Sequence, residues 1–352
     1  MTARVSELGG RATISSSGQL IRGRAFDGAM IAACGWLISG GFLDAWAHNH
    51  IPSLETFFTP WHAVLYSGFL VVAVVMVGAV VINRMRGYSW SESVPPGYEL
   101  SLFAVPAFAL GGVGDMFWHI FFGIEKNTDA ILSPTHLLLM ICFGVLMAGP
   151  FRALWRRTRP GRALEKPDQL LAPIALSLII LIFSLVTQSL HPYLSLAPTN
   201  TYATQSNEQM LAIAGMILET VILMSIILLA LKRWQLAFGS FTLFFTLNAI
   251  ALSFMQDHYI VIPIAIVAGL LVDILYQQLR PSTAHVSELR LFAAAVPTIH
   301  YLVYFLALLL TSTVVWSIHL ALGSIVVSGI TGCLLSYLLV PPREEEAEKQ
   351  AL

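Results

Sequence analysis

The sequence predicts an all-α, polytopic integral membrane protein, a helical bundle of about ten transmembrane helices. Of its 352 residues, 57% are hydrophobic and only 11% are charged, and the mean hydropathy is +0.75. A water-soluble domain cannot bury that much apolar surface. The apolar residues are gathered into long segments between polar breaks, and the positive charges fall at one set of segment ends. These observations together exclude a soluble fold.

Ten apolar segments are each close to the roughly 20 residues that a helix needs to cross a bilayer. The boundary between the last two depends only on Thr311, Ser312 and Thr313. In chain order, the expected spans cover residues 29–48, 61–83, 99–122, 134–155, 170–190, 208–231, 235–256, 259–277, 289–311 and 313–339.

The basic residues predict the orientation of these spans, because Lys and Arg near span ends gather on the cytoplasmic side. With the N-terminus inside, all of the 19 Lys and Arg residues except Lys126 are cytoplasmic. Both termini are then cytoplasmic (N-in/C-in), and the expected location is the cell (plasma) membrane, which the chain crosses many times.

The same pattern divides the chain into a helical-hairpin unit and a larger helical bundle, with polar segments around them. The N-terminal segment has no short apolar core or cleavage site typical of a signal peptide. The expected parts are a flexible cytoplasmic tail (1–28), a duplicated helical-hairpin metal-binding unit (29–155), a basic cytoplasmic loop (156–169), a C-terminal helical bundle (170–340) and a charged cytoplasmic tail (341–352).

Several function classes find no support in the sequence. Cys34, Cys142 and Cys333 lie inside separate spans, so neither a disulfide framework nor a CxxC redox pair is indicated. No glycine motif for nucleotide binding is found, and the net charge of -1 gives no indication of a nucleic-acid partner. We therefore expect no nucleic acid among the partners.

The informative region is residues 41–146, where spans one and two are echoed by spans three and four. The first copy reads GFLDAWAHNHIPSLETFFTPWHAVLYSGF and the second reads GGVGDMFWHIFFGIEKNTDAILSPTHLLLMICF. Each has an Asp and a His four residues apart at the outer end of a rising helix and a Glu in the loop. Each then ends in Thr/Ser-Pro-x-His. The sequence thus contains an internal repeat rich in metal-ligand side chains.

The spacing predicts that each copy gathers its ligands at one depth near the extracytoplasmic face. Residues at i and i+4 share a helix face, which pairs the Asp with the first His. Thr59 and Ser133 are N-cap candidates, and the proline that follows each cap puts the second His in the opening turn of the descending helix. The expected metal ligands are Asp44, His48, His62, Asp115, His119 and His136, with Glu55, Glu125 and His50 as additional candidates.

Mixed imidazole and carboxylate ligands suit iron, copper, zinc or manganese rather than a soft thiolate site. A helix N-terminus also disfavours imidazolium and so keeps His62 and His136 neutral and able to bind metal. A single His at a span end is more often a hydrogen-bonded interfacial residue than a ligand. Two copies of one three-residue set are harder to explain in that way, so we expect a metal site.

These motifs resemble those of the third (C) subunit of copper-dependent membrane monooxygenases, the particulate methane and ammonia monooxygenases. In that family an Asp-x3-His helix end is followed by an acid, then Thr-x-Phe-Thr-Pro-x-His, then Leu-Phe-Tyr. Here Asp44-x3-His48 is followed by ETFFTPWH, ending at His62, and then by Leu65-Tyr66. The resemblance covers about 110 residues, those from 41 to 146.

The resemblance implies how the ligands are shared. Asp44, His48 and His62 match the ligands of one copper position, while Asp115 and His119 match an Asn and a His that form a neighbouring position together with the His at 62. His136 matches the following Pro-x-His. The carboxylate at 115, where the family has Asn, adds negative charge and makes iron an alternative to copper.

The function implied by the resemblance is an O2-dependent oxidase or monooxygenase-like enzyme, or a subunit of one, that acts on a small apolar substrate. Copper, with iron as the alternative, would be held as one or two ions. The expected partners are the lipid bilayer, O2, and either additional membrane subunits or further copies of this chain. Here oxygen chemistry follows from the resemblance alone.

Two other hypotheses remain open from the residues. A metal-binding or metal-transporting protein without oxidation chemistry would need a continued polar path, which Glu219, His300 and Asp273 could supply. Haem b would need two axial histidines facing each other, and the accompanying Asp residues argue against it.

Overall fold

The computed structural model describes residues 18–51, 57–123, 132–160, 164–201 and 205–341. Within these ranges the chain is helical with no strand, which confirms the predicted all-α polytopic bundle. The expected tails at 1–28 and 341–352 lie largely outside the described residues, as do most of the loops that follow the first and third predicted spans.

The long helices follow the predicted spans in order. Thr311 ends one helix and Ile318 begins the next, so the boundary expected at residues 311–313 is confirmed. The elements are α1 (Arg24–His50), α2 (Pro60–Met85), α3 (Trp90–Ser93), α4 (Glu99–Phe122), α6 (Pro134–Met147), α7 (Gly149–Arg157), α8 (Lys166–Val186), η1 (Gln188–Leu190), α9 (Pro192–Ser195), η2 (Ala197–Thr199), α10 (Ser206–Leu231), α11 (Ser240–Gln256), α12 (Val261–Leu279), α13 (Val286–Thr311) and α14 (Ile318–Leu339).

Nine helices of the described chain are long and apolar enough to cross a membrane, when α6 and α7 are taken as one span, Pro134–Arg157. The remaining predicted span corresponds to α11, which has 17 residues and begins at Ser240 rather than at 235. Asp273 of α12 explains this start, because its carboxylate accepts hydrogen bonds from the backbone N–H of Phe241 and of Thr242 at 3.3 and 2.9 Å. These are orphan donors of the α11 N-terminus.

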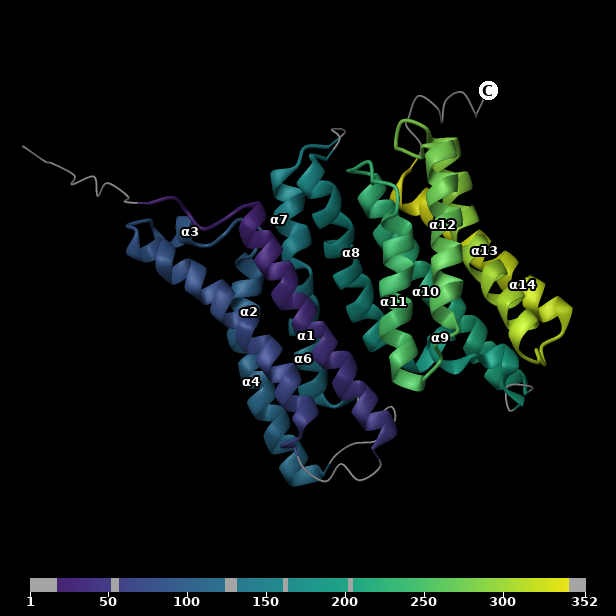
Figure 1. The fold of residues 1–352 in the computed structure, drawn as a ribbon, viewed down its shortest axis with the longest axis horizontal. Coiled ribbons are helices and arrows are strands. Elements are labelled where there is room, and N and C mark those ends of the chain that lie inside the picture. The colour runs from purple at the N-terminus through teal and green to yellow at the C-terminus, as the bar shows by residue number, and fades with distance from the viewer. Residues whose placement is uncertain (1–17, 52–56, 124–131, 161–163, 202–204, 342–352) are drawn as a thin grey trace, which may run out of the picture.

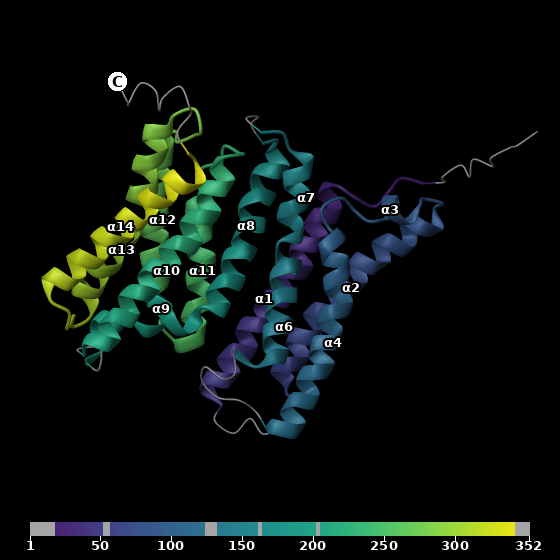
Figure 2. The ribbon, with the colours of Figure 1, turned by 180° about the vertical axis from the view of Figure 1, so that it is seen from behind.

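The helices form two groups that meet along α8 (Figure 1). One contains α1, α2, α4, α6 and α7, and the other contains α9 to α14. In Figure 2, which views the molecule from behind, α14 lies at the edge farthest from α2 and α4. Packing of α8 against α1 and α6 on one side and α11 on the other joins the groups. Many large apolar side chains face outward, as expected for a lipid-facing surface.

Two glycines set the close crossing of α1 and α2. A Cβ added at Gly40 would lie 2.7 Å from the Cα of Leu65, and one added at Gly68 would lie 2.7 Å from the Cα of Leu37. Small residues allow helix backbones to approach in this way within a membrane. Because Gly40 is one turn before Asp44, this contact also fixes the end of α1 against the start of α2.

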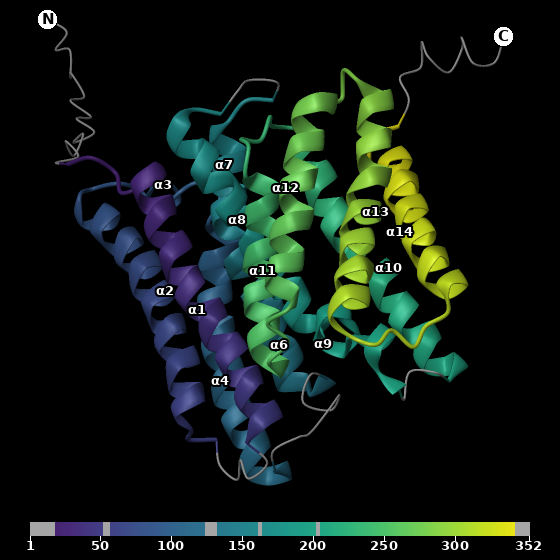
Figure 3. The same cartoon turned by 45° about the vertical axis from the view of Figure 1, so that its right-hand side comes forward.

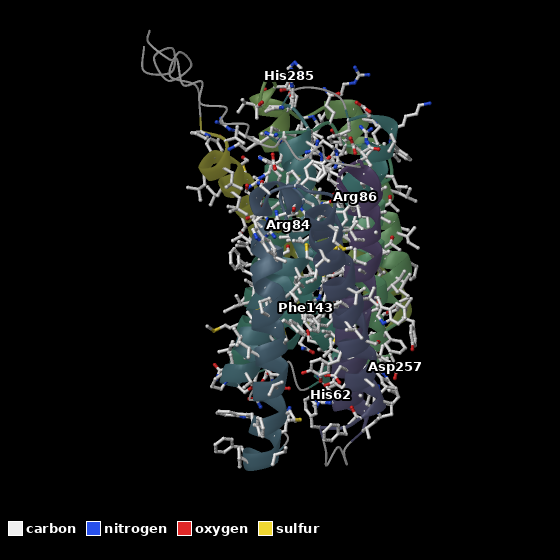
Figure 4. All side chains as sticks on the ribbon, turned by 90° about the vertical axis from the view of Figure 1, so that its left-hand side faces the viewer. His62, Arg84, Arg86, Phe143, Asp257 and His285 are labelled. Atoms are coloured by element: carbon white, nitrogen blue, oxygen red, sulfur yellow. The ribbon has the colours of Figure 1, made fainter. Side chains whose placement is uncertain are left out.

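Charged side chains hold together the end of the bundle at which α1 begins, opposite the end that carries Asp44. Asp168 of α8 accepts hydrogen bonds from Arg24 of α1 at 3.0 Å and from Arg157 of α7 at 2.8 Å. Arg157 also pairs with Asp27, which accepts a hydrogen bond from Tyr98 at 3.0 Å. Both carboxylates are buried. Figure 4 shows Arg84 and Arg86 toward this end and His62 at the other.

Candidate metal centre

Capped helix starts place His62 and His136 where the sequence predicted them. Thr59 Oγ1 accepts a hydrogen bond from the backbone N–H of His62 at 3.1 Å. Ser133 Oγ accepts one from the N–H of His136 at 3.3 Å. A proline follows each cap as a first helical residue. Both N-cap predictions are therefore confirmed, and both histidines lie in the first turn of their helices.

Asp44, His48 and His62 form one compact group, here called the first triad. The Asp44 carboxylate lies between the two rings, with Oδ1 3.5 Å from His62 Nε2 and Oδ2 3.8 Å from His48 Nε2. One ligand atom of each residue lies within 4.8 Å of those of the other two. His62 is buried, while Asp44 and His48 are partly exposed.

Asp115, His119 and His136 form the second triad, which also keeps its ligand atoms within 4.8 Å of one another. Asp115 Oδ1 lies 3.1 Å from His136 Nε2, and Oδ2 lies 3.5 Å from His119 Nε2. The Thr135 hydroxyl donates a hydrogen bond to Asp115 Oδ1 at 2.9 Å. Only 1% of Asp115 is exposed, so this triad lies deeper in the protein than the first.

The two triads are neighbours, because their four imidazole rings follow one another in a row. The ring centroids of His48 and His62 are 6.1 Å apart, those of His62 and His119 are 6.2 Å apart, and those of His119 and His136 are 5.5 Å apart. Phe57 stacks on His62 at 4.9 Å and so covers one side of the row. Each triad could hold one ion, and two such ions would lie in neighbouring sites.

The contacts of His62 define which ring nitrogen is available to a metal. Its Nδ1 lies 2.6 Å from the carbonyl oxygen of Phe57, so Nδ1 carries hydrogen and donates it. In a neutral ring Nε2 then holds a lone pair, which points toward a carboxylate oxygen of Asp44 only 3.5 Å away. Two electron-pair donors at this separation need a cation between them or a second proton on the ring. The α2 N-terminus disfavours that second proton.

His119 repeats this arrangement on α4. Its Nδ1 lies 3.4 Å from the carbonyl oxygen of Gly123, at the C-cap of that helix. The carbonyl orients the ring so that Nε2 faces Asp115. Backbone carbonyls that accept the second N–H of an imidazole are a common means of fixing a metal ligand.

Of the additional ligand candidates, the structure describes His50, which belongs to neither triad. His50 Nδ1 donates to the carbonyl of Trp46 at 3.0 Å, and its Nε2 lies 3.1 Å from Asp257, which follows α11. Hydrogen bonds from Tyr259 and from His50 hold the pKa of the Asp257 carboxyl below its usual range. His50 thus links α1 to a distant loop, while Glu55 and Glu125 lie outside the described residues.

Tyr66 lies next to the first triad, although the sequence motif gave it no role as a ligand. Its ring centroid lies 6.3 Å from that of His62, one turn along α2. The hydroxyl is buried and has no hydrogen-bond partner among the described residues. Gly112 of α4 makes room for this ring, because a Cβ there would lie 2.7 Å from Tyr66 Cε1. The sequence signal for Tyr66 was its spacing of four residues from His62, which places both side chains on one face of α2.

Glu219, His300 and Asp273, the residues named for a transport path, each contact other residues of the second group of helices. Glu219 pairs with His191 at 3.3 Å, while the Nε2 of His300 lies 3.3 Å from the Tyr193 hydroxyl. Asp273 is fully buried and caps α11. All of these residues belong to the second group of helices, separate from the triads.

Comparison of the chain with protein-family models, with curated proteins and with solved structures gave no match. The two triads therefore provide the basis for a functional hypothesis, and their geometry shows two groups of side chains that could hold metal ions.

Proposed function

We propose that the chain is a membrane metalloprotein whose two triads hold one or two copper ions, with iron as the alternative, for the O2-dependent oxidation of a small apolar substrate. The observation that supports this best is the orientation of His62. Its lone pair and the Asp44 carboxylate point at each other from 3.5 Å, as ligands of one ion would. The resemblance of residues 41–146 to the monooxygenase C subunit is the reason for preferring copper and oxygen chemistry.

The donor set fits such an ion. Each triad offers two imidazole nitrogens and one carboxylate, which suit copper and iron. The described cysteines, Cys34, Cys142 and Cys333, lie outside both triads, so no thiolate ligand is available there. When bound, a redox-active ion with an open coordination position would bind O2 and pass to it electrons from an external reductant.

The chain's own residues would orient and enclose the centre. The Phe57 and Gly123 carbonyls hold the rings of His62 and His119, and Thr135 holds the Asp115 carboxylate. Phe57 excludes water from one side of the imidazole row. The Tyr66 ring lies 6.3 Å from that of His62, and its buried hydroxyl would be the chain's own hydrogen-bond donor near His62 on α2.

An apolar substrate would arrive from the lipid. Phe117 and Phe121 of α4 stack on each other and are 48% and 74% exposed, so they offer an apolar outer surface beside the second triad. We place the triads at the extracytoplasmic face, because the opposite end carries the arginine clusters expected in the cytoplasm. The assembly would include lipid and, by the same resemblance, further membrane subunits or copies of this chain.

Transport of the metal without oxidation is less well supported by the packing. Between the triads and the arginine end of the bundle, the ring of Phe108 stacks on that of Phe69 with centroids 4.5 Å apart and contacts that of Phe143 at 5.8 Å. Phe108 and Phe143 are buried, so the layer is apolar and offers no ligand for a passing cation. A transport path through the first group of helices would have to open this layer.

The test is metal analysis combined with electron paramagnetic resonance on the full chain in nanodiscs. The wild-type protein should retain copper or iron near stoichiometry, and the double variant His48→Ala, His119→Ala should lose it. His285→Ala, at an exposed residue of the opposite end, is the matched control and should keep the metal. Metal-loaded protein should then consume O2 when a reductant and a small hydrocarbon are supplied. Failure of folded wild-type protein to retain metal after reconstitution would contradict the proposal.

A further inference from the structure

A small cavity lies inside the molecule and is lined by apolar and polar side chains. The lining residues come from α8, α9, α10, α11 and α13, whose arrangement is shown in Figure 3. Its volume is about 30 Å³, which leaves room for about two water molecules. The polar residues that line it are His191, Tyr193, Glu219, Thr220, Asn248, His300 and Tyr301. None of the residues that line this cavity in the described chain is Lys or Arg.

Glu219 is the charged residue of this cavity. It lies near the middle of α10 and is only 9% exposed. The Thr187 hydroxyl donates a hydrogen bond to Oε1 at 2.8 Å, and His191 Nε2 lies 3.3 Å from Oε2. An ionisable residue at this depth needs a partner of opposite charge or a function.

His191 does not supply the opposite charge. Its Nδ1 accepts a hydrogen bond from the backbone N–H of Tyr193 at 3.2 Å, so that nitrogen carries no hydrogen. The hydrogen of the neutral ring is therefore on Nε2, where it is donated to Glu219. The pair as arranged carries a net charge of -1 in apolar surroundings.

Two further polar atoms lie buried among the lining residues with no partner in the described chain. They are Nδ1 of His300 and Oδ1 of Asn248. The other nitrogen of His300 contacts the Tyr193 hydroxyl at 3.3 Å. The hydroxyls of Thr220 and Tyr301 are already used, because both donate to the carbonyl of Met216. Water in the cavity would satisfy His300 and Asn248 and reach Glu219.

We propose that Glu219 is a reversible proton-binding site, which takes up a proton from cavity water held by His300 and Asn248. Uptake turns hydronium into water and the carboxylate into a carboxylic acid, so no other reactant is needed and the buried charge is removed. A metal ion fits less well. Among the described residues, three ligand atoms within 4.8 Å of one another occur only in the two triads. The inference does not depend on the metal centre.

Infrared spectroscopy of the full chain in nanodiscs tests this proposal. The carbonyl stretch of a protonated carboxylic acid should appear as the pH is lowered and disappear reversibly as it is raised. It should be absent from Glu219→Gln and present in Glu208→Gln, a matched change at an exposed residue in the first turn of the same helix.

A second variant keeps the test informative if Glu219→Gln fails to fold. Thr187→Val removes one hydrogen bond that stabilises the carboxylate, so the midpoint of the titration should move to higher pH, while a purely structural role would leave it unchanged. The proposal is overturned if the band is missing from the wild type at every pH. It is also overturned if added Na⁺ or Zn²⁺ alters the Glu219 carboxylate signal and pH does not.

Discussion

The Nε2 atom of His62 lies 3.5 Å from Oδ1 of Asp44, although the opposite nitrogen of the same ring donates to the Phe57 carbonyl. His50 makes a comparable pair of contacts, with Trp46 and Asp257. His50, however, is exposed in the last turn of α1, whereas His62 is buried in the first turn of α2. The same kind of contact therefore links α1 to a distant loop at His50, whereas at His62 it belongs to a group of side chains that could hold a metal ion.

Replacing His62 by Ala should remove metal from the first triad, because both remaining ligands are partly exposed. The apparent Kd should rise by at least about tenfold, the smallest loss expected even for an indirect perturbation of a metal site. Metal titration of nanodisc protein measures this change. His50→Ala is the control and should bind metal as the wild type does. Equal losses in both variants would contradict the assignment.

Thr135→Val should weaken metal binding at the second triad without removing a ligand. The Thr135 hydroxyl fixes Asp115 Oδ1 at 2.9 Å, and losing such an outer contact typically costs about 10–100-fold in metal affinity. Thr331→Val is the matched control, since that hydroxyl bonds only within its own helix, α14. An unchanged metal affinity in Thr135→Val would show that this hydrogen bond does not support the centre.

Gly68→Ala should destabilise the protein and Gly78→Ala should not, although both are on α2. A Cβ at Gly68 would lie 2.7 Å from the Cα of Leu37, whereas a Cβ at Gly78 meets nothing within 4 Å. Overpacking of this kind costs about 1–3 kcal/mol, and the helix propensity gained at Gly78 contributes about 0.5–1 kcal/mol. Thermal unfolding in detergent measures both. A gain in stability at Gly68 would contradict the close crossing of α1 and α2.

Asp168→Ala should cost about 3 kcal/mol of unfolding free energy, because it removes a buried carboxylate that pairs with two partly exposed arginines. The value lies at the low end for a buried pair, since Arg24 keeps Glu165 and Arg157 keeps Asp27. Glu165→Ala also removes a partner of Arg24, but that carboxylate is 72% exposed, so the loss should be below about 1 kcal/mol. Denaturant unfolding of both variants gives the difference, and similar losses would contradict a structural role for Asp168.

Local features of the fold and centre were predictable from the sequence because their causes are local. The spans follow from hydropathy. The positions of His62 and His136 in the first turn of a helix follow from an N-cap residue and a proline within the three preceding residues. The Asp and His at i and i+4 share a helix face by geometry alone. These rules do not require knowledge of which helices meet.

The contacts between distant segments were not predictable in this way. His50 contacts Asp257, which lies more than 200 residues away in the sequence. Glu219 pairs with His191 and not with His300. The late start of α11, at Ser240, depends on Asp273 of α12. The periodicity of the sequence does not predict that Asp273 lies beside the start of α11. Each depends on how two helices pack, which hydropathy and capping patterns do not encode.

The apolar layer of Phe69, Phe108 and Phe143 limits how electrons can reach the triads. Arg24 and Asp44 lie 20 residues apart on α1, so the arginine end is about 30 Å away along the helix. Under the proposed function, a water-soluble reductant would therefore have to approach from the face that the triads occupy. In sealed vesicles, a water-soluble reductant should reduce the bound metal only from the triad face, and rapid reduction from the opposite side would contradict this.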